Sequence, residues 1–286
     1  MIVAGLRNVV IATVMAVALV SGAAAQDVKR EITRIAGDLY RFQNNFHYSV
    51  FLITPDGALV TDPINAEAAA WLKAEIDKRF NKQVKYVVLS HDHADHSSGG
   101  EVFDDTAVIV AHENARAVIL GEMRPTAVPE ITFPDRMTIH LGGKTIELIH
   151  VGRNHSNNMI VVRFPAERAL YVVDFIPVRA VAFKDLPDAY IPDWIDSIRA
   201  VEAMDFDVLI PGHGAIGAKS DATAFREYMS DLYAAVLAGA RAGKSLDELK
   251  ASIKLDKYQD WFQYEDWLPL NIEGMYNRIT LHRRGN

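Results

Sequence analysis

One heptad contains the side chains with the most evident chemistry. Residues 90–96 read Ser-His-Asp-His-Ala-Asp-His, so three imidazoles and two carboxylates fall within one turn of the chain. Imidazole nitrogen and carboxylate oxygen are the ligands that Zn²⁺ and similar borderline cations take, and a catalytic zinc keeps one position open for water or substrate. The heptad therefore predicts a metal site.

The elements before the heptad indicate how it is held. Residues 84–89 form an apolar run that predicts a buried strand ending directly at the heptad. Residues 66–80 carry apolar side chains at the three-to-four-residue spacing of an amphipathic helix, namely Ala69, Leu72, Ile76 and Phe80. A helix followed by a strand would therefore present the heptad at one edge of a sheet.

Three later residues share this position at the end of a predicted strand. His155 lies in a polar turn between the strands predicted at 146–151 and 159–164. Asp174 follows an apolar strand, and His213 follows Val-Leu-Ile within Pro-Gly-His-Gly. We expect these side chains to join those of the heptad and supply the ligands that the heptad lacks for two metal ions.

The remaining pattern indicates one large domain rich in strands at first. Turn signals separate short apolar runs, and no low-complexity linker or short repeat interrupts the chain. Further strands are predicted at 32–35, 39–42, 48–53, 58–61, 107–111, 137–141, 169–173 and 208–210, and helices at 112–120, 193–204, 223–242 and 270–281. The domain is predicted to span 26–286, with a C-terminal helical segment from about 219.

Composition excludes several function classes. The 286 residues carry a net charge of −7 with lysine and arginine scattered among acids, so a nucleic-acid partner is not expected. The chain has no cysteine, which rules out disulfides, a thiolate nucleophile and thiolate metal ligands. Metal ligands are therefore limited to histidine, aspartate and glutamate.

The first 25 residues predict a secretory signal peptide. Arg7 precedes an apolar stretch, and Ala23 and Ala25 stand at the −3 and −1 positions of a cleavage site before Gln26. A transmembrane anchor is the alternative, but the stretch is shorter than the roughly 20 residues that a bilayer requires. We expect a periplasmic or secreted protein without stable membrane insertion after cleavage.

The order of these histidines and aspartates resembles the metallo-β-lactamase superfamily. The resemblance rests on His91-x-His93-x-Asp95-His96 followed by His155, Asp174 and His213, and it spans roughly 32–214. It implies a mixed α/β fold, a four-layer αββα sandwich with a binuclear metal site in a cleft at one edge. The ligand set is similar to that of glyoxalase II, and exported proteins that accompany quinoprotein oxidation systems are similar overall.

The resemblance also implies how the ligands divide between two Zn²⁺ ions. Each ion takes three side chains and one carboxylate bridges them: His91, His93 and His155 for the first ion, Asp95, His96 and His213 for the second, and Asp174 between the two. Asp92 is left out of this set. Iron and manganese remain open, because ligand type discriminates poorly among these metals.

Other residues are expected to support the site. Asp62 matches an acid that lies beneath the heptad in the family and orients ligating imidazoles, although it could instead cap the next helix. His47 lies in a turn that often forms a flap over the cleft, and Arg179 and Lys184 could meet a substrate carboxylate. A C-terminal aromatic cluster could form a lid or a dimer contact, but core packing is favoured for its members, Trp261, Phe262, Tyr264, Trp267 and Leu268.

The resemblance implies an exported binuclear zinc hydrolase acting on a small carbonyl substrate of β-lactam, lactone or ester type. A metal-bound hydroxide would attack the carbonyl carbon, and Asp95 would orient it. Two alternatives stay open: a glyoxalase II-like thioesterase, and a non-catalytic metal-binding accessory protein of a periplasmic oxidation system. The sequence supplies neither the substrate nor the oligomeric state.

Overall fold

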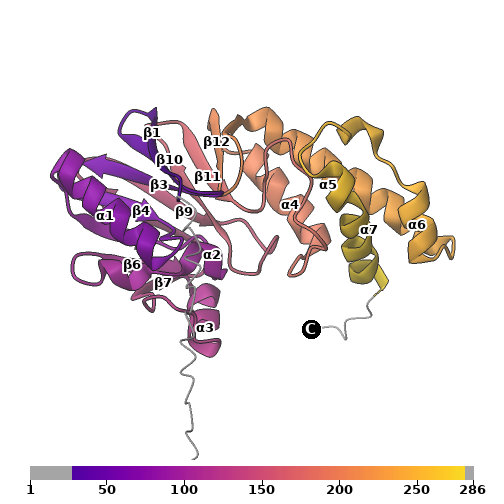
Figure 1. Ribbon diagram of the computed structural model, residues 1–286, viewed down its shortest axis with the longest axis horizontal. Coiled ribbons are helices and arrows are strands. Elements are labelled where there is room, and N and C mark those ends of the chain that lie inside the picture. Colours follow the sequence, from indigo (N-terminus) through magenta and orange to yellow (C-terminus); the bar gives the residue numbers. More distant parts are fainter. Residues whose placement is uncertain (1–27, 281–286) are drawn as a thin grey trace, which may run out of the picture.

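The computed structural model describes residues 28–280 (Figure 1). The predicted signal peptide lies outside the described residues. Among the described residues, no helix combines the length and the apolar character needed to span a membrane.

The first sheet has seven strands in chain order. They are β1 (Arg30–Ala36), β2 (Leu39–Asn44), β3 (His47–Thr54), β4 (Gly57–Thr61), β5 (Val84–Val88), β6 (Val108–His112) and β7 (Ile131–Phe133). The first four strands pair antiparallel and the last four pair parallel. Parallel pairing requires crossovers, which here contain helices α1 (Ala66–Phe80) and α3 (Glu113–Gly121).

The second sheet has six strands in the order β13-β12-β11-β10-β9-β8. They are β8 (Arg136–Leu141), β9 (Lys144–His150), β10 (Ile160–Phe164), β11 (Ala169–Val173), β12 (Val208–Pro211) and β13 (Gly217–Ala218). Strands β11 and β12 are parallel and are joined through α4 (Ile191–Glu202). Predicted ligands therefore follow the carboxyl ends of β5, β11 and β12, each of which belongs to a parallel pair of strands.

Two apolar cores define the layers. The larger core joins the inner faces of both sheets, with Leu52 and Val88 from the first and Leu148 and Val162 from the second. The smaller core lies between the first sheet and helices α1 and α3. Asn65 caps α1 by accepting the backbone N–H of Ala68, so the helix begins where its buried stripe begins. The predicted αββα sandwich is confirmed.

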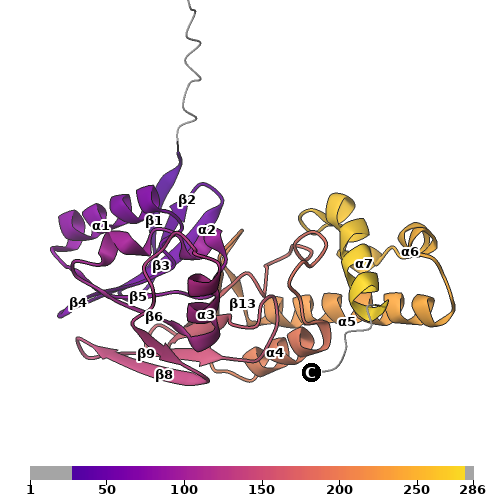
Figure 2. The same ribbon diagram turned by 90° about the horizontal axis from the view of Figure 1, so that it is seen from below.

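The C-terminal helices extend beside the sandwich, as Figures 1 and 2 show. They are α5 (Lys219–Arg241), α6 (Leu246–Ser252) and α7 (Tyr264–Thr280), with a 3₁₀ turn at Asp256–Tyr258. Helix α5 packs on α4 and on α7. Helix α7 thereby lies against the loop that follows Asp174.

Some predicted elements differ from those observed. The helix predicted at 270–281 was placed wrongly at its start, because α7 begins ahead of Pro269 and accommodates it within the helix. Several short elements were not predicted: β7, β13, α6, the single turn α2 (Ala94–Ser97) and the 3₁₀ turn at Gly100–Phe103. Helix α6 did carry a signal, since Ser245 and Glu248 form a capping box.

Candidate metal centre

The heptad leaves β5 and enters α2 as a well-anchored loop whose first three residues are buried. Ser90 donates its backbone N–H to Asp62 at 2.7 Å, and Ile160 donates to the carbonyl of Ser90 at 2.9 Å, so both sheets hold the first residue. Asp92 turns away from the histidines, because Asn158 and Arg124 donate to its carboxylate at 2.7 and 3.0 Å. The loop thus presents His91, His93, Asp95 and His96 from a fixed backbone.

The three later residues approach the same place from the second sheet. His155 follows β9, Asp174 follows β11 and His213 follows β12. Val173 adopts a φ of 50°, a conformation that is costly for a β-branched residue. Its carbonyl accepts the N–H of Gly212 at 2.8 Å, which ties the ends of β11 and β12 together. This backbone turn aims Asp174 between the histidines.

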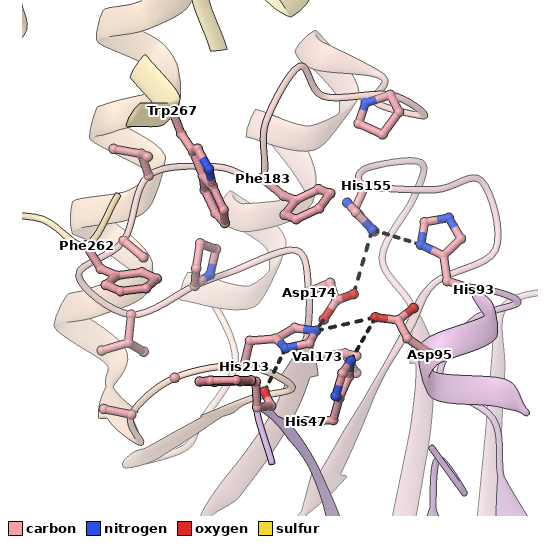
Figure 3. Close-up of a pocket in the computed structure, with 18 residues that line it drawn as sticks. His47, His93, Asp95, His155, Val173, Asp174, Phe183, His213, Phe262 and Trp267 are labelled. Atoms are coloured by element: carbon pink, nitrogen blue, oxygen red, sulfur yellow. Dashed lines mark hydrogen bonds and ion pairs between the residues drawn. The ribbon is translucent and has the colours of Figure 1, made fainter. Parts of the chain in front are cut away.

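All seven predicted ligands lie in two groups that share Asp174. The first group is His91, His93, His155 and Asp174; the second is Asp95, His96, His213 and Asp174. Within each group, one ligand atom per residue lies within 4.8 Å of the others. The two oxygens of Asp174 face different groups: Oδ2 lies 3.6 Å from His91 Nε2, and Oδ1 lies 3.2 Å from His96 Nε2. Figure 3 shows part of this arrangement.

The electrostatics of the centre follow from burial and close charges. Burial lowers the pKa of His91 well below its usual value, and the nearby His93 lowers it further. Burial also lowers the pKa of His155 to about 4. Burial alone would raise the pKa of Asp174, but His96, His213 and His91 outweigh it and hold that pKa well below the usual range. Neutral His91 and His155 beside an ionised Asp174 are in the protonation states that metal ligation requires. His96 differs, because burial alone would lower its pKa but Asp174 and Asp62 outweigh burial and raise that pKa well above the usual value, so a bound cation would displace its proton.

This donor set fits two divalent cations. His91 Nε2 is buried, faces the cluster and makes no hydrogen bond within the described residues. Imidazole nitrogens also lie close to one another, with His155 Nε2 3.1 Å from His93 Nδ1 and His96 Nε2 3.2 Å from His213 Nε2. Each neutral imidazole has one unprotonated nitrogen, and several such nitrogens close together can bind one cation placed between them. The assignment of these residues as ligands stays a prediction, and the geometry supports it.

Asp62 lies beneath the heptad, and the helix-capping alternative does not apply. The cap of α1 is Asn65. Asp62 is fully buried, accepts the hydroxyl of Tyr171 at 2.9 Å, and lies 3.5 Å from His96 Nδ1. Tyr171 was not singled out from the sequence, because it stands within the continuous apolar strand β11, as a core residue would.

A cavity of about 770 Å³ opens over the cluster. Its polar lining comes from His47, His93, Asp95, His155, Asp174 and His213. The aromatic side chains that line it are Phe46, Phe183, Phe262 and Trp267, and valine, proline and alanine complete the wall. A volume of this size is in the range of small-molecule sites.

The three residues predicted to contact the substrate do not all lie at the cavity. His47 lines the cavity, and its Nε2 lies 3.4 Å from Asp95 Oδ2. Arg179 and Lys184 are not among the lining residues; the guanidinium of Arg179 pairs with Asp260 at the surface. Asp188, which the sequence did not indicate, lies 3.3 Å from His93 Nε2.

The aromatic cluster divides between the core and the cavity. Trp261, Tyr264 and Leu268 are buried in the core, as favoured from the sequence. Phe262 and Trp267 instead line the cavity. No local pattern separates these two groups, because the division depends on how α7 docks.

Comparison with known proteins identifies the family. A model described as "Metallo-beta-lactamase superfamily" matches residues 44–213, which include every predicted ligand. The chain belongs to the metallo-beta-lactamase superfamily.

Individual relatives are more distant. The chain is 30% identical over 189 residues to the 2,4-dinitroanisole O-demethylase subunit alpha of Nocardioides sp. strain JS1661, covering 64% of this chain and 55% of that protein. It is 28% identical over 147 residues to the metallo-beta-lactamase type 2 of Bacillus cereus, covering 50% of this chain and 56% of that protein. The chain thus spans about half the length of these curated relatives.

Solved structures share the fold. A metallo-beta-lactamase from Pontibacter korlensis superposes with a TM-score of 0.65 at 21% identity, covering 71% of this chain and 99% of that chain. The DIM-1 metallo-beta-lactamase gives a TM-score of 0.63 at 19% identity, with 71% and 97% covered.

Proposed function

We propose that this protein is an exported, binuclear zinc-dependent hydrolase that cleaves a small carbonyl substrate such as a lactone, an ester or a β-lactam. The observation that carries the proposal is the pair of ligand groups sharing Asp174 at the base of a cavity. Membership of the superfamily supports the hydrolytic chemistry, and export rests on the predicted signal peptide alone.

The metal ions supply the electrophilic chemistry when bound: they polarise the carbonyl group and make water reactive near neutral pH. The residues determine where this happens. His91, His93 and His155 would hold one ion, and Asp95, His96 and His213 the other, with Asp174 between them. Because His93, His155, Asp95, Asp174 and His213 also line the cavity, ions held by these residues would be within reach of a substrate bound there.

Asp95 is suited to orienting the attacking water. Burial would raise the pKa of Asp95, but the hydrogen bond from His47 and the nearby charges of His96 and His213 lower it to about 2. The carboxylate is therefore ionised near pH 7 and can accept a hydrogen bond from water without taking up its proton. His47 fixes Asp95 from the cavity side.

Metal content and turnover together test this proposal. We expect two zinc ions per chain, and hydrolysis of at least one of a chromogenic cephalosporin, an acyl homoserine lactone and a p-nitrophenyl ester. The His93→Ala variant should lose metal and turnover, whereas His140→Ala, which changes an exposed histidine of β8, should lose neither. If His93→Ala leaves both unchanged, the site assignment is wrong.

Two further substrates address the other readings. Lactoylglutathione tests the thioesterase alternative, which the cavity disfavours because none of its described lining residues is a lysine or an arginine to meet the glutathione carboxylates. The similarity to a 2,4-dinitroanisole O-demethylase subunit and the aromatic lining make 2,4-dinitroanisole a second probe. Two bound metals with no turnover of any substrate would favour the accessory-protein reading.

A further inference from the structure

Resting on that hydrolase function, we infer that the site takes a substrate with an uncharged, apolar group that packs against Phe183, Phe262 and Trp267. We call these three side chains the aromatic wall. Trp267 contacts both phenylalanines edge to face, with ring centroids 5.2 Å from Phe183 and 6.4 Å from Phe262. Figure 3 draws Phe262 and Trp267 on the opposite side of the cavity from His93 and Asp95.

The aromatic wall exposes apolar surface that a ligand would cover. Phe262 is 66% exposed and Phe183 is 49% exposed, and both lie within the cavity lining. Phe46, which is 82% exposed, lies at the same cavity. Large apolar side chains gathered around one opening are typical of a binding site, whereas single exposed ones scattered over a surface are not informative.

The side chains around the cavity argue against an anionic group at the aromatic wall. The described ionisable side chains in its lining are the histidines and aspartates of the cluster and His47. The two basic residues predicted as substrate contacts are outside the lining: Arg179 pairs with Asp260, and the Lys184 ammonium lies 5.0 Å from the centre of the Phe183 ring. A substrate carboxylate on the aromatic wall would lose its hydration without gaining a lysine or arginine partner among the described lining residues.

The aromatic wall is held in place before any ligand arrives. Asn271 of α7 is fully buried and donates to the carbonyl oxygens of Ala182 and Lys184, the two neighbours of Phe183, at 2.9 and 2.6 Å. Gly274 packs so closely that an added Cβ would lie 1.9 Å from the carbonyl oxygen of Asp185.

The backbone of Phe262 is anchored as well, because its N–H donates to the carbonyl of Arg179 at 2.9 Å. A pre-organised apolar surface binds its ligand with little further loss of conformational entropy. The hydrogen bonds at Phe262 and beside Phe183 therefore fix the backbone that carries the aromatic wall.

Hydrolysis of p-nitrophenyl esters by the zinc-loaded full chain tests the inference. From acetate to butyrate to hexanoate, kcat/KM should rise about fourfold per added methylene until the apolar surface is covered. The p-nitrophenyl monoester of glutaric acid, which ends in a carboxylate, should be at least about tenfold poorer than the pentanoate ester of similar length.

Phe262→Ala and Trp267→Ala should each raise KM for the hexanoate ester about tenfold and raise KM for the acetate ester by a smaller factor. Phe262 is well exposed, so its truncation leaves the core intact. The matched control is Leu120→Ala, which removes a 48% exposed apolar side chain of α3 outside the cavity and should change neither ester.

Binding without turnover separates this inference from the hydrolase proposal. The neutral ketone 4-phenyl-2-butanone should bind to wild type in calorimetry and bind about tenfold more weakly to Phe262→Ala. If the cephalosporin, the lactone and the esters are all left uncleaved but the ketone shows this pattern, the hydrolase proposal fails and the apolar ligand site stands. If esters are cleaved with no dependence on chain length or on Phe262, the inference is overturned and the hydrolase stands.

Two more results would overturn the inference. One is preference for the glutarate monoester over the pentanoate ester. The other is a change of sedimentation coefficient in Phe262→Ala and Trp267→Ala with KM unchanged, because the aromatic wall would then be a contact between chains.

Discussion

Asp62 accepts the backbone N–H of Ser90 at 2.7 Å, so a carboxylate at the end of β4 fixes the residue that precedes the first histidine of the heptad. The second oxygen of Asp62 accepts the hydroxyl of Tyr171 from the other sheet at 2.9 Å and lies 3.5 Å from His96 Nδ1. The buried side chain of Asp62 therefore connects both sheets to the heptad and lies where it can orient the imidazole of His96.

Replacing this carboxylate should weaken metal binding without unfolding the protein. In Asp62→Asn, an amide of the same shape retains one acceptor oxygen but presents an NH₂ group where Tyr171 or His96 needs an acceptor. We expect metal affinity to fall about 10–100-fold, the usual effect of losing a partner that orients a ligand. Competition with a chromogenic chelator measures it.

Asn65→Ala is the matched control for Asp62→Asn. It removes the cap of α1 three residues away and should cost about 1 kcal/mol of stability. Metal affinity should not change. Equal metal affinity in Asp62→Asn and wild type would show that Asp62 supports only the fold.

Gly212 should not tolerate a side chain, because it lies against the candidate ligands His96 and Asp174. A Cβ at this position would lie 2.8 Å from His96 Cε1 and 2.9 Å from Asp174 Oδ1. Gly212→Ala should displace these two ligands, lower metal affinity by at least about tenfold and leave the far-UV spectrum unchanged. Gly121→Ala meets open space at the end of α3 and serves as the control. A full complement of tightly bound metal in Gly212→Ala would contradict the assignment.

The candidate ligands could be selected from the sequence because the heptad, His155, Asp174 and His213 each come within a few residues after a strand. His91, Asp174 and His213 all come after short apolar runs, so the local pattern already indicates that they gather at one edge of the sandwich. Their order along the chain then indicated the fold. Residue type and position carry this signal together, and neither requires knowledge of a distant contact.

The cavity wall could not be predicted in this way. Phe262 and Trp267 stand among aromatic residues that enter the core, and they reach the cavity only because Asn271 and Gly274 dock α7 on the loop around Phe183. Asn271 reads in the sequence as a polar residue within a helix. Its role depends on carbonyl groups almost ninety positions away, so no local pattern reports it.

The docking of α7 through Asn271 should be measurable as stability. The fully buried side chain donates to the carbonyl oxygens of Ala182 and Lys184 and accepts the hydroxyl of Tyr228. Asn271→Ala leaves buried carbonyl groups unpaired and should lower the free energy of unfolding by about 1–3 kcal/mol. Tyr228→Phe removes only one of these bonds and should cost less.

Urea denaturation gives the free energies of unfolding for both variants. Asn271→Ala should also raise KM for long-chain esters, because Phe183 loses its backbone anchors, whereas Tyr228→Phe should not. If both variants unfold like wild type, α7 is not docked by this contact.

His150 should make stability pH-dependent in a defined window. Burial, together with the charge of His112, whose ring centroid is 4.1 Å away, lowers the pKa of His150 to about 4. An unfolded chain would protonate this imidazole near pH 6.5. Between these values the unfolded state holds a proton that the folded state does not, so the free energy of unfolding should fall as the pH drops from about 6.5 to about 4.

Replacing His150 isolates this contribution from the titration of the other histidines. Chemical denaturation at a series of pH values should give a shallower decline below about pH 6.5 for His150→Gln than for wild type, because glutamine does not titrate. His140→Gln alters an exposed histidine of β8 and should follow wild type across the whole range. Parallel curves for wild type and His150→Gln would mean that the folded protein protonates His150 as readily as the unfolded chain does.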